Sequence, residues 1–146
     1  MEKAKVFARS YFAPRMNTEN ARKWILIVDD DASVRLMLAR VLGGEGYKVL
    51  TAANSVDALD MTETSLMDLV LLDLNMPHTN GWEILAAFAA RKIAPPVIII
   101  TAVPNQQAAA RAAGVETVLE KPLDFPRLIQ TVNQLLFKSA TEPHFP

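Results

Sequence analysis

The chain of 146 residues is long enough for one ordinary domain, and 51% of it is apolar, which is typical of a globular protein with a buried core. Its net charge of -1 gives no basic excess that would favour nucleic acid. The absence of cysteine excludes disulfides and cysteine-bound zinc and fits a reducing cytoplasm, where we expect the protein to work. His78 and His144 are too far apart for a histidine metal cluster. No apolar run approaches the length of a membrane span, and the N-terminus lacks the apolar segment of a signal peptide.

The composition of the chain suggests one folded domain between two less regular ends. Residues 1–23 are mixed and mildly basic, and we interpret them as a flexible N-terminal extension; a helical arm that packs on the domain or on a partner is the alternative. The folded domain is expected to span residues 24–138. Residues 139–146 contain two prolines and are expected to form a disordered C-terminal tail.

Apolar runs and helix-capping residues alternate regularly from Trp24 onward. The pattern predicts a strand at 24–29, a helix capped by Asp31 or Ser33 that ends at glycines 43–44, a strand at 47–52 and a helix capped by Asn54. It then predicts a strand at 69–73, a loop over 77–81 and a helix, a strand at 97–101, a helix from about 104 to 114, a strand at 115–120 and a helix capped by Asp124.

Helical spacing of three or four selects the residues that should face the core from these helices. They are Val34, Met37, Leu38, Val41, Val56, Leu59, Ile84, Leu85, Phe88, Leu128, Ile129, Val132, Leu135 and Leu136. The strands are almost continuously apolar, as parallel strands buried on both faces are. Five strands alternating with five helices predict a doubly wound α/β domain.

Chemically active side chains follow four of the expected strands. Asp29 and Asp30 follow the first, Asp73 ends the third, Thr101 ends the fourth and Lys121 follows the fifth. The carboxyl ends of parallel strands form one edge of the sheet, where ligands bind. Neighbouring carboxylates repel each other, and a hard divalent cation such as Mg²⁺ relieves that repulsion through oxygen ligands. An ammonium and a hydroxyl beside them suit a phosphoryl group.

Each of these residues also has an ordinary structural interpretation. Paired acids are as common in solvated loops as in metal sites, threonine is a common strand terminus, and a lysine before proline is usually an exposed loop residue. Asp31 is better explained as a helix N-cap than as a ligand. The combination at one edge favours a site that binds a metal and a phosphoryl group.

The ordered set of motifs resembles the receiver domain of bacterial response regulators over roughly residues 24–138. The motifs are the stretch from Trp24 to Asp31, the segment Asp-Leu-Asn-Met-Pro-His-Thr-Asn-Gly at 73–81, Thr101-Ala102, and Lys121-Pro122. The resemblance implies a flavodoxin-like (βα)5 fold with strand order 2-1-3-4-5. It also implies a signalling switch rather than a conventional enzyme, working in a two-component phosphorelay.

The resemblance assigns the phosphoryl chemistry to one carboxylate. Asp73 would be the phosphoacceptor, attacking the phosphohistidine of a sensor histidine kinase or a histidine phosphotransfer protein. Mg²⁺ would be the cofactor, bound by the carboxylates of Asp30 and Asp73, by Asp29 mainly through water, and by the backbone carbonyl of Asn75.

Three further residues receive roles by the same resemblance. Lys121 would pair with the aspartyl phosphate, and Thr101 would move toward the phosphoryl oxygen and transmit the signal. Pro122 would follow a cis peptide bond, which is costly except before proline.

The chain departs from the family pattern at two places. The switch position three residues before the lysine is usually tyrosine or phenylalanine and is Val118 here, and the stretch from Thr101 to Lys121 is about two residues shorter than usual. The helix between them is therefore expected to be short or shifted. Both departures lie where receivers commonly form homodimers or contact effectors, so they concern the output and not phosphorylation.

Other classes of protein fit the sequence less well. A metal-dependent phosphohydrolase with an aspartyl nucleophile often needs a second acid two residues after that nucleophile, and Asn75 stands there. A pseudo-receiver that only binds partners would not need the complete set of acids, hydroxyl and amine. We expect no effector domain after residue 138, so the chain would be a stand-alone receiver or a fragment, with an unidentified downstream effector, no direct binding of nucleic acid and no contact with membranes.

Overall fold

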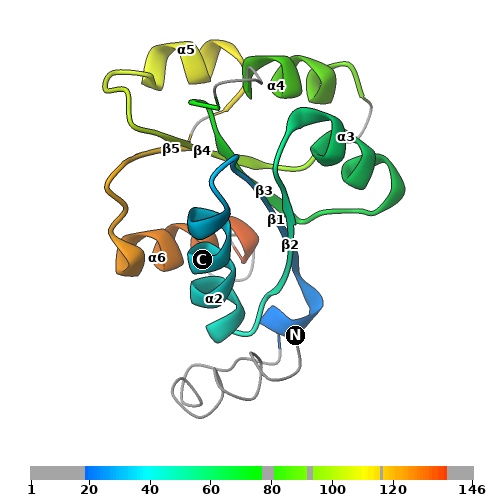
Figure 1. Ribbon diagram of the computed structural model, residues 1–146, viewed down its shortest axis with the longest axis vertical. Coiled ribbons are helices and arrows are strands. Elements are labelled where there is room, and N and C mark those ends of the chain that lie inside the picture. Colours follow the sequence, from blue (N-terminus) through cyan, green and yellow to red (C-terminus); the bar gives the residue numbers. More distant parts are fainter. Residues whose placement is uncertain (1–18, 77–80, 92–93, 116, 138–146) are drawn as a thin grey trace, which may run out of the picture.

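The computed structural model describes residues 19–76, 81–91, 94–115 and 117–137, which form a central parallel sheet between two layers of helices (Figure 1). The strands are β1 (Trp24–Val28), β2 (Lys48–Ala52), β3 (Leu69–Asp73), β4 (Val97–Thr101) and β5 (Thr117–Glu120). All pairings are parallel and the order is β2-β1-β3-β4-β5. The doubly wound fold and the predicted order 2-1-3-4-5 are therefore confirmed. Strand ends differ slightly: β1 ends at Val28, β2 begins at Lys48, and β5 begins at Thr117.

Helices cover both faces of the sheet (Figure 1). On the first face lie α2 (Ala32–Gly44) and α6 (Phe125–Leu136), and on the second lie α3 (Ser55–Thr64), α4 (Gly81–Ala89) and α5 (Gln107–Ala112). The caps form as predicted. Asp31, rather than Ser33, caps α2 by accepting hydrogen bonds from two backbone N–H groups. Asn54 caps α3 and Asp124 caps α6, and each accepts a hydrogen bond from one backbone N–H.

Alternation along the two central strands divides the core between the two faces. Residues at odd positions of β1 and β3 pack with α2 and α6, namely Ile25, Ile27, Leu69 and Leu71. Residues at even positions pack with α3, α4 and α5, namely Leu26, Val28, Val70 and Leu72. Side chains of a strand point alternately to opposite faces, so both faces must be apolar when both are covered. This explains the continuous apolar runs in the sequence.

Two of the helical core predictions are wrong. Met37 is 45% exposed and Val56 is 74% exposed. The buried stripe of α2 instead runs through Leu38 and Leu42, and Met37 lies at its edge. The buried residue of α3 is Ala58, two positions after Val56, which places Val56 about 200° away around the helix. The valine therefore faces solvent from the first turn.

The fourth helix is shorter than the alanine-rich pattern suggested. It was expected to begin near Pro104, but α5 begins at Gln107 and contains six residues. Residues 102–106 form a loop in which Asn105 adopts a left-handed conformation with φ of 62°, a region that asparagine tolerates better than most residues. The prediction of a short or shifted helix is confirmed.

The end of the predicted N-terminal extension contacts the domain. Residues Asn20–Arg22 form a short 3-10 helix, η2, and the buried Asn20 side chain donates from Nδ2 to the carbonyl of Glu45 at 2.6 Å. Most of the extension, the loop at 77–80 with His78, and the tail with His144 lie outside the described residues. Of the helices that are described, none has the length and apolar character needed to cross a membrane.

Candidate functional site

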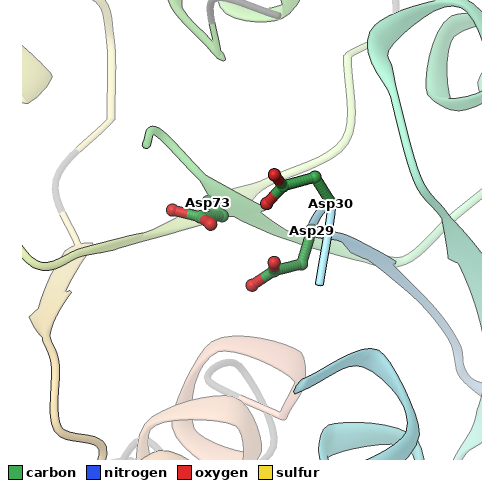
Figure 2. A group of neighbouring side chains, drawn as sticks. All are labelled: Asp29, Asp30 and Asp73. Atoms are coloured by element: carbon green, nitrogen blue, oxygen red, sulfur yellow. The ribbon is translucent and has the colours of Figure 1, made fainter. Parts of the chain in front are cut away.

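Three carboxylates come together at the carboxyl edge of the sheet, as the sequence predicted (Figure 2). The parallel register pairs Ile27 with Leu71, and the next positions of the same parity are Asp29 and Asp73. Asp30 follows directly, and one oxygen from each of the three carboxylates lies within 4.8 Å of the others. An all-oxygen, multiply charged donor set of this kind fits a hard cation such as Mg²⁺.

Asp29 is the most buried of the three acids, with 2% of its surface exposed. Its Oδ1 accepts a hydrogen bond from the Asp31 backbone N–H at 2.9 Å, and its Oδ2 lies 3.6 Å from the Lys121 ammonium. Burial raises the pKa of the Asp29 carboxyl above its ordinary value, and the Asp73 charge adds to this, against the opposing effects of the Asp31 N–H and of Lys121. A cation beside Asp29 therefore stabilises the ionised form of its carboxyl group.

Asp73 is 4% exposed and is held in a defined orientation. Its Oδ1 accepts from the Asn75 backbone N–H at 2.9 Å, and its Oδ2 lies 3.3 Å from Lys121 Nζ. The same ammonium therefore bridges Asp29 and Asp73. Lys121 is placed there because its backbone N–H donates to the Thr101 carbonyl at 2.8 Å, which continues the pairing of β4 and β5 beyond Glu120.

Thr101 lies at the end of β4 and is fully buried. Its hydroxyl donates to the side-chain oxygen of Asn75 at 2.9 Å, and it accepts from the Val103 backbone N–H at 3.0 Å. From the sequence, Asn75 was expected to offer its backbone carbonyl to Mg²⁺ and its side chain to the tuning of phosphoryl-group loss. The side-chain contact with Thr101 was not predicted, because the loop after β4 approaches the loop after β3 only in the folded sheet.

Pro122 and Val118 lie near the site but contribute no polar side-chain group to it. The Lys121–Pro122 peptide bond is cis, as the resemblance implied. Val118 is half-buried on β5 and packs against the core on the face that carries α5. Beside it is an open depression of about 350 Å³, lined by Gln107, Val118, Leu119, Glu120, Pro122, Leu123, Asp124 and Arg127. This depression lies along β5 between the starts of α5 and α6, in the region where both departures from the family pattern were found.

Two residues that the sequence analysis did not assign to the site support its backbone. Arg35 donates from its guanidinium to the Asp29 carbonyl at 2.7 Å. Gly81, the first residue of α4, approaches the chain just after β3 so closely that a Cβ atom there would lie 3.2 Å from the Asp73 carbonyl oxygen and 2.9 Å from a Leu74 methyl carbon. The glycine was predicted only as part of a loop, and its close approach depends on how α4 packs.

Asp29→Asn is expected to weaken Mg²⁺ binding by roughly tenfold or more, because one carboxylate charge within a few ångströms of a divalent ion is lost. It should also change how metal-free stability depends on pH. The folded pKa of Asp29 lies above the unfolded value of 3.8, so the native state binds more protons than the unfolded state between these values. The free energy of unfolding of the wild type should therefore fall as the pH rises from 3.8 to the folded pKa of Asp29. The Asp29→Asn variant has no such carboxyl group and should not show this decrease.

Chemical denaturation in the absence of metal, repeated across that pH range, measures the effect. Asp30→Asn is the matched control because it removes the exposed neighbouring acid, for which burial imposes no comparable cost. An Asp29→Asn profile parallel to that of the wild type would contradict the electrostatic account of this carboxylate.

Comparison with known proteins gives the family of the chain. The family model for the response regulator receiver domain matches residues 25–133, which is most of the chain. The chain belongs to this family. The match runs from the second residue of β1 to within α6 and includes the edge that carries the three acids, Thr101 and Lys121.

Relatives of this receiver domain are regulators from several bacteria. It is 40% identical over 114 residues to the transcriptional regulatory protein ZraR of Salmonella typhimurium, an alignment that covers 77% of this chain and 26% of ZraR. It is 33% identical over 120 residues to the response regulator MprA of Mycobacterium avium, covering 81% of this chain and 53% of MprA. The alignment thus spans about a quarter of ZraR and about half of MprA.

Solved receiver structures are similar over most of the chain. A CheY-like receiver domain protein from Methanospirillum hungatei aligns with a TM-score of 0.73 and 28% identity, covering 83% of this chain and 98% of that one. The response regulator TrrA from Thermotoga maritima, solved in complex with Mg²⁺ and BeF, aligns with a TM-score of 0.71 and 32% identity, covering 78% and 99%. The fold and the signalling class predicted from the sequence are therefore confirmed.

Proposed function

We propose that this receiver domain accepts a phosphoryl group on Asp73 from a phosphohistidine, with Mg²⁺ bound by Asp29, Asp30, Asp73 and the backbone carbonyl of Asn75. The donor would be a sensor histidine kinase or a histidine phosphotransfer protein. The observation that carries the proposal is the bridging of two buried carboxylates, Asp29 and Asp73, by one ammonium at the sheet edge. This arrangement places the proposed nucleophile, the Asp73 carboxylate, beside the Lys121 ammonium, which can bind a phosphoryl oxygen.

In the proposed transfer reaction, Asp73, Asn75 and Lys121 have different roles. A carboxylate oxygen of Asp73 forms the new bond to phosphorus while the phosphorus–nitrogen bond to the donor histidine breaks, and the imidazole leaves with that electron pair. The Asn75 N–H keeps the carboxylate oriented, and Lys121 moves from carboxylate to phosphoryl oxygen. Mg²⁺, when bound, neutralises charge on the phosphoryl oxygens and on the neighbouring acids.

The proposal is tested by incubating the protein with Mg²⁺ and acetyl phosphate and measuring its intact mass. One phosphoryl group should be added, only in the presence of the metal, and peptide mapping after borohydride reduction should locate it at Asp73. The controls are acetyl phosphate with a chelator and the protein with Mg²⁺ alone. An adduct found elsewhere, or no adduct in any condition, would reject the assignment.

A phosphohydrolase is the less favoured alternative. The position two residues after Asp73 holds an amide whose oxygen already accepts two hydrogen bonds, from Thr101 and from the Ala102 N–H. Such a group supplies no proton for acid catalysis. The intrinsic activity that we propose is therefore limited to accepting the phosphoryl group and losing it slowly to water.

The output is proposed to pass through a downstream effector, attached to this domain or contacted by it. The relatives named as transcriptional regulators make control of transcription the leading candidate. The face that carries α5, with the depression beside Val118, is the proposed place for effector contact or for a homodimer.

Val103→Glu is expected to speed the loss of the phosphoryl group by roughly tenfold. Val103 is 42% exposed and lies two residues after Thr101, with its N–H on the Thr101 hydroxyl. An apolar side chain there cannot orient an attacking water, whereas a carboxylate can accept a hydrogen bond from one, and a well-placed base contributes rate factors of this order or larger. The measurement is the decay of the phosphorylated protein after removal of acetyl phosphate. Val103→Met is the apolar control, and equal decay of all three proteins would count against the role.

A further inference from the structure

The side chain of Asn75 joins the segment after β3 to the segment after β4. Its Oδ1 accepts one hydrogen bond from the Thr101 hydroxyl and one from the Ala102 backbone N–H, each at 2.9 Å. The Thr101 hydroxyl has a single proton, and that proton is used in this contact. Its oxygen accepts from the Val103 N–H at 3.0 Å. The Asn75 amide oxygen thus binds the Thr101 hydroxyl and the Ala102 N–H directly, and the Val103 N–H is joined to it through the hydroxyl oxygen.

This contact competes directly with the proposed role of Thr101. To bond a phosphoryl oxygen on Asp73, the Thr101 hydroxyl must donate its only proton there and give up Asn75. Thr101 is fully buried, and among the described residues the other acceptor within reach of its hydroxyl is the Val103 carbonyl, at 3.5 Å. A hydroxyl that left Asn75 without a phosphoryl group to receive it would be poorly satisfied, which stabilises the present arrangement.

We infer that the Asn75 side chain is a latch that holds residues 101–103 in the resting conformation and opposes phosphoryl binding until Thr101 is released. This inference rests on the proposed function, because the phosphoryl group on Asp73 is what releases the hydroxyl. Asn75 acts through Thr101 and is a positioning residue. Its latch is the side-chain amide, whereas its proposed contact with Mg²⁺ uses the backbone carbonyl.

The loop of residues 102–106 is also held at a second place, near its other end. The backbone N–H of Asn105 donates to the Glu120 carboxylate at 3.4 Å, so the loop is held near its other end by the strand that precedes Lys121. Both attachments are to single side chains, and no regular ladder fixes residues 102–106. Releasing Asn75 would therefore remove the attachment of Thr101 and Ala102 to the segment after β3, while the exposed Glu120 contact at the other end contributes less.

Asn75→Ala removes the acceptor and keeps the backbone carbonyl. At saturating Mg²⁺, the variant should bind beryllofluoride, a phosphoryl mimic, about three- to tenfold more tightly than the wild type, since one net hydrogen bond of the resting state no longer has to be broken. In the Thr101→Val background, where there is no hydroxyl to release, the same substitution should have a clearly smaller effect. An unchanged or weaker affinity in Asn75→Ala would overturn the latch.

Amide signals of the metal-free protein give a readout that does not depend on phosphoryl chemistry. In Asn75→Ala the Ala102 amide proton should shift upfield and exchange faster with water, because Ala102 is exposed and its acceptor is gone. Asn75→Asp keeps an acceptor oxygen at the same place, so its Ala102 amide should stay downfield and exchange as slowly as in the wild type or more slowly. This control guards against a general loss of folding in the alanine variant. An Ala102 amide that is the same in all three proteins would overturn the inference.

The two proposals fail in different ways. If wild-type protein neither binds beryllofluoride nor gains a phosphoryl group from acetyl phosphate, the proposed function is wrong, whatever the Ala102 amide shows. If the wild type does both and Asn75→Ala binds beryllofluoride no more tightly, the proposed function stands and the latch is wrong.

Discussion

Asp73→Asn is expected to abolish the phosphoryl adduct completely. The replacement amide has nearly the same shape and can still accept the Asn75 N–H, so the fold of the edge should persist. An amide is not a nucleophile toward phosphorus, and the two remaining carboxylates of the cluster, Asp29 and Asp30, are proposed to bind only the metal. The measurement is intact mass after incubation with acetyl phosphate and Mg²⁺.

Asp30→Asn is the matched control for this experiment. It removes a carboxylate of the same cluster that is proposed to bind only the metal, so it should slow the reaction and require more Mg²⁺ without preventing the adduct. An adduct of undiminished yield on Asp73→Asn would show that another residue is the acceptor. Complete loss in both variants would mean that the metal site, and not the nucleophile, limits the measurement.

Lys121→Ala is expected to have the second largest effect, and it should appear in two measurements. Without the ammonium, two buried carboxylates face each other with no counterion, and metal-free stability at neutral pH should fall by roughly 1–3 kcal/mol, less than for a fully buried pair because the lysine side chain is 27% exposed. Added Mg²⁺ should restore most of this loss, because it supplies the missing positive charge.

The second measurement concerns the switch. In the wild type, amide shift changes on adding Mg²⁺ and beryllofluoride should concentrate in residues 74–76 and 101–106 and fade along α6. In Lys121→Ala the mimic should still bind at the metal, but the shift changes in residues 101–106 should become smaller. The reason is that only the Thr101 contact with the mimic remains, whereas the Lys121 contact has been removed. Lys121→Arg keeps the charge and is the control. Full shift changes in the alanine variant, or large changes centred on Val118, would contradict the mechanism.

Residue pattern alone was enough to predict the architecture and most of the site edge. Five apolar runs separated by capping residues implied parallel strands buried on both faces, and parallel strands bring their carboxyl ends to one edge. Asp29, Asp30, Asp73 and Lys121 could therefore be placed together from their positions at strand ends. The roles of these residues remain predictions, to be decided by the experiments above.

Errors arose where a feature depended on how one element packs on another. Met37 and Val56 were expected in the core because they are apolar and nearly in phase with it, but only the orientation of each helix on the sheet decides which apolar residues of its wide face are covered. The start of α5 was misplaced because an alanine-rich segment is helical by propensity throughout, and the path of the 102–106 loop decides where the helix begins.

The sequence by itself determined the fold class, the strand order through its family resemblance, and the set of acids, hydroxyl and amine at one edge, because these follow from periodicity and from residues adjacent to strand ends. Only the tertiary structure decided which side chains touch. The bridge from Lys121 to both Asp29 and Asp73, the close approach of Gly81 to the chain after β3, and the hold of Asn75 on Thr101 join residues between 7 and 92 positions apart along the chain. Whether such a contact forms depends on differences of a few tenths of an ångström in the separation of two loops, and no local sequence pattern encodes that separation.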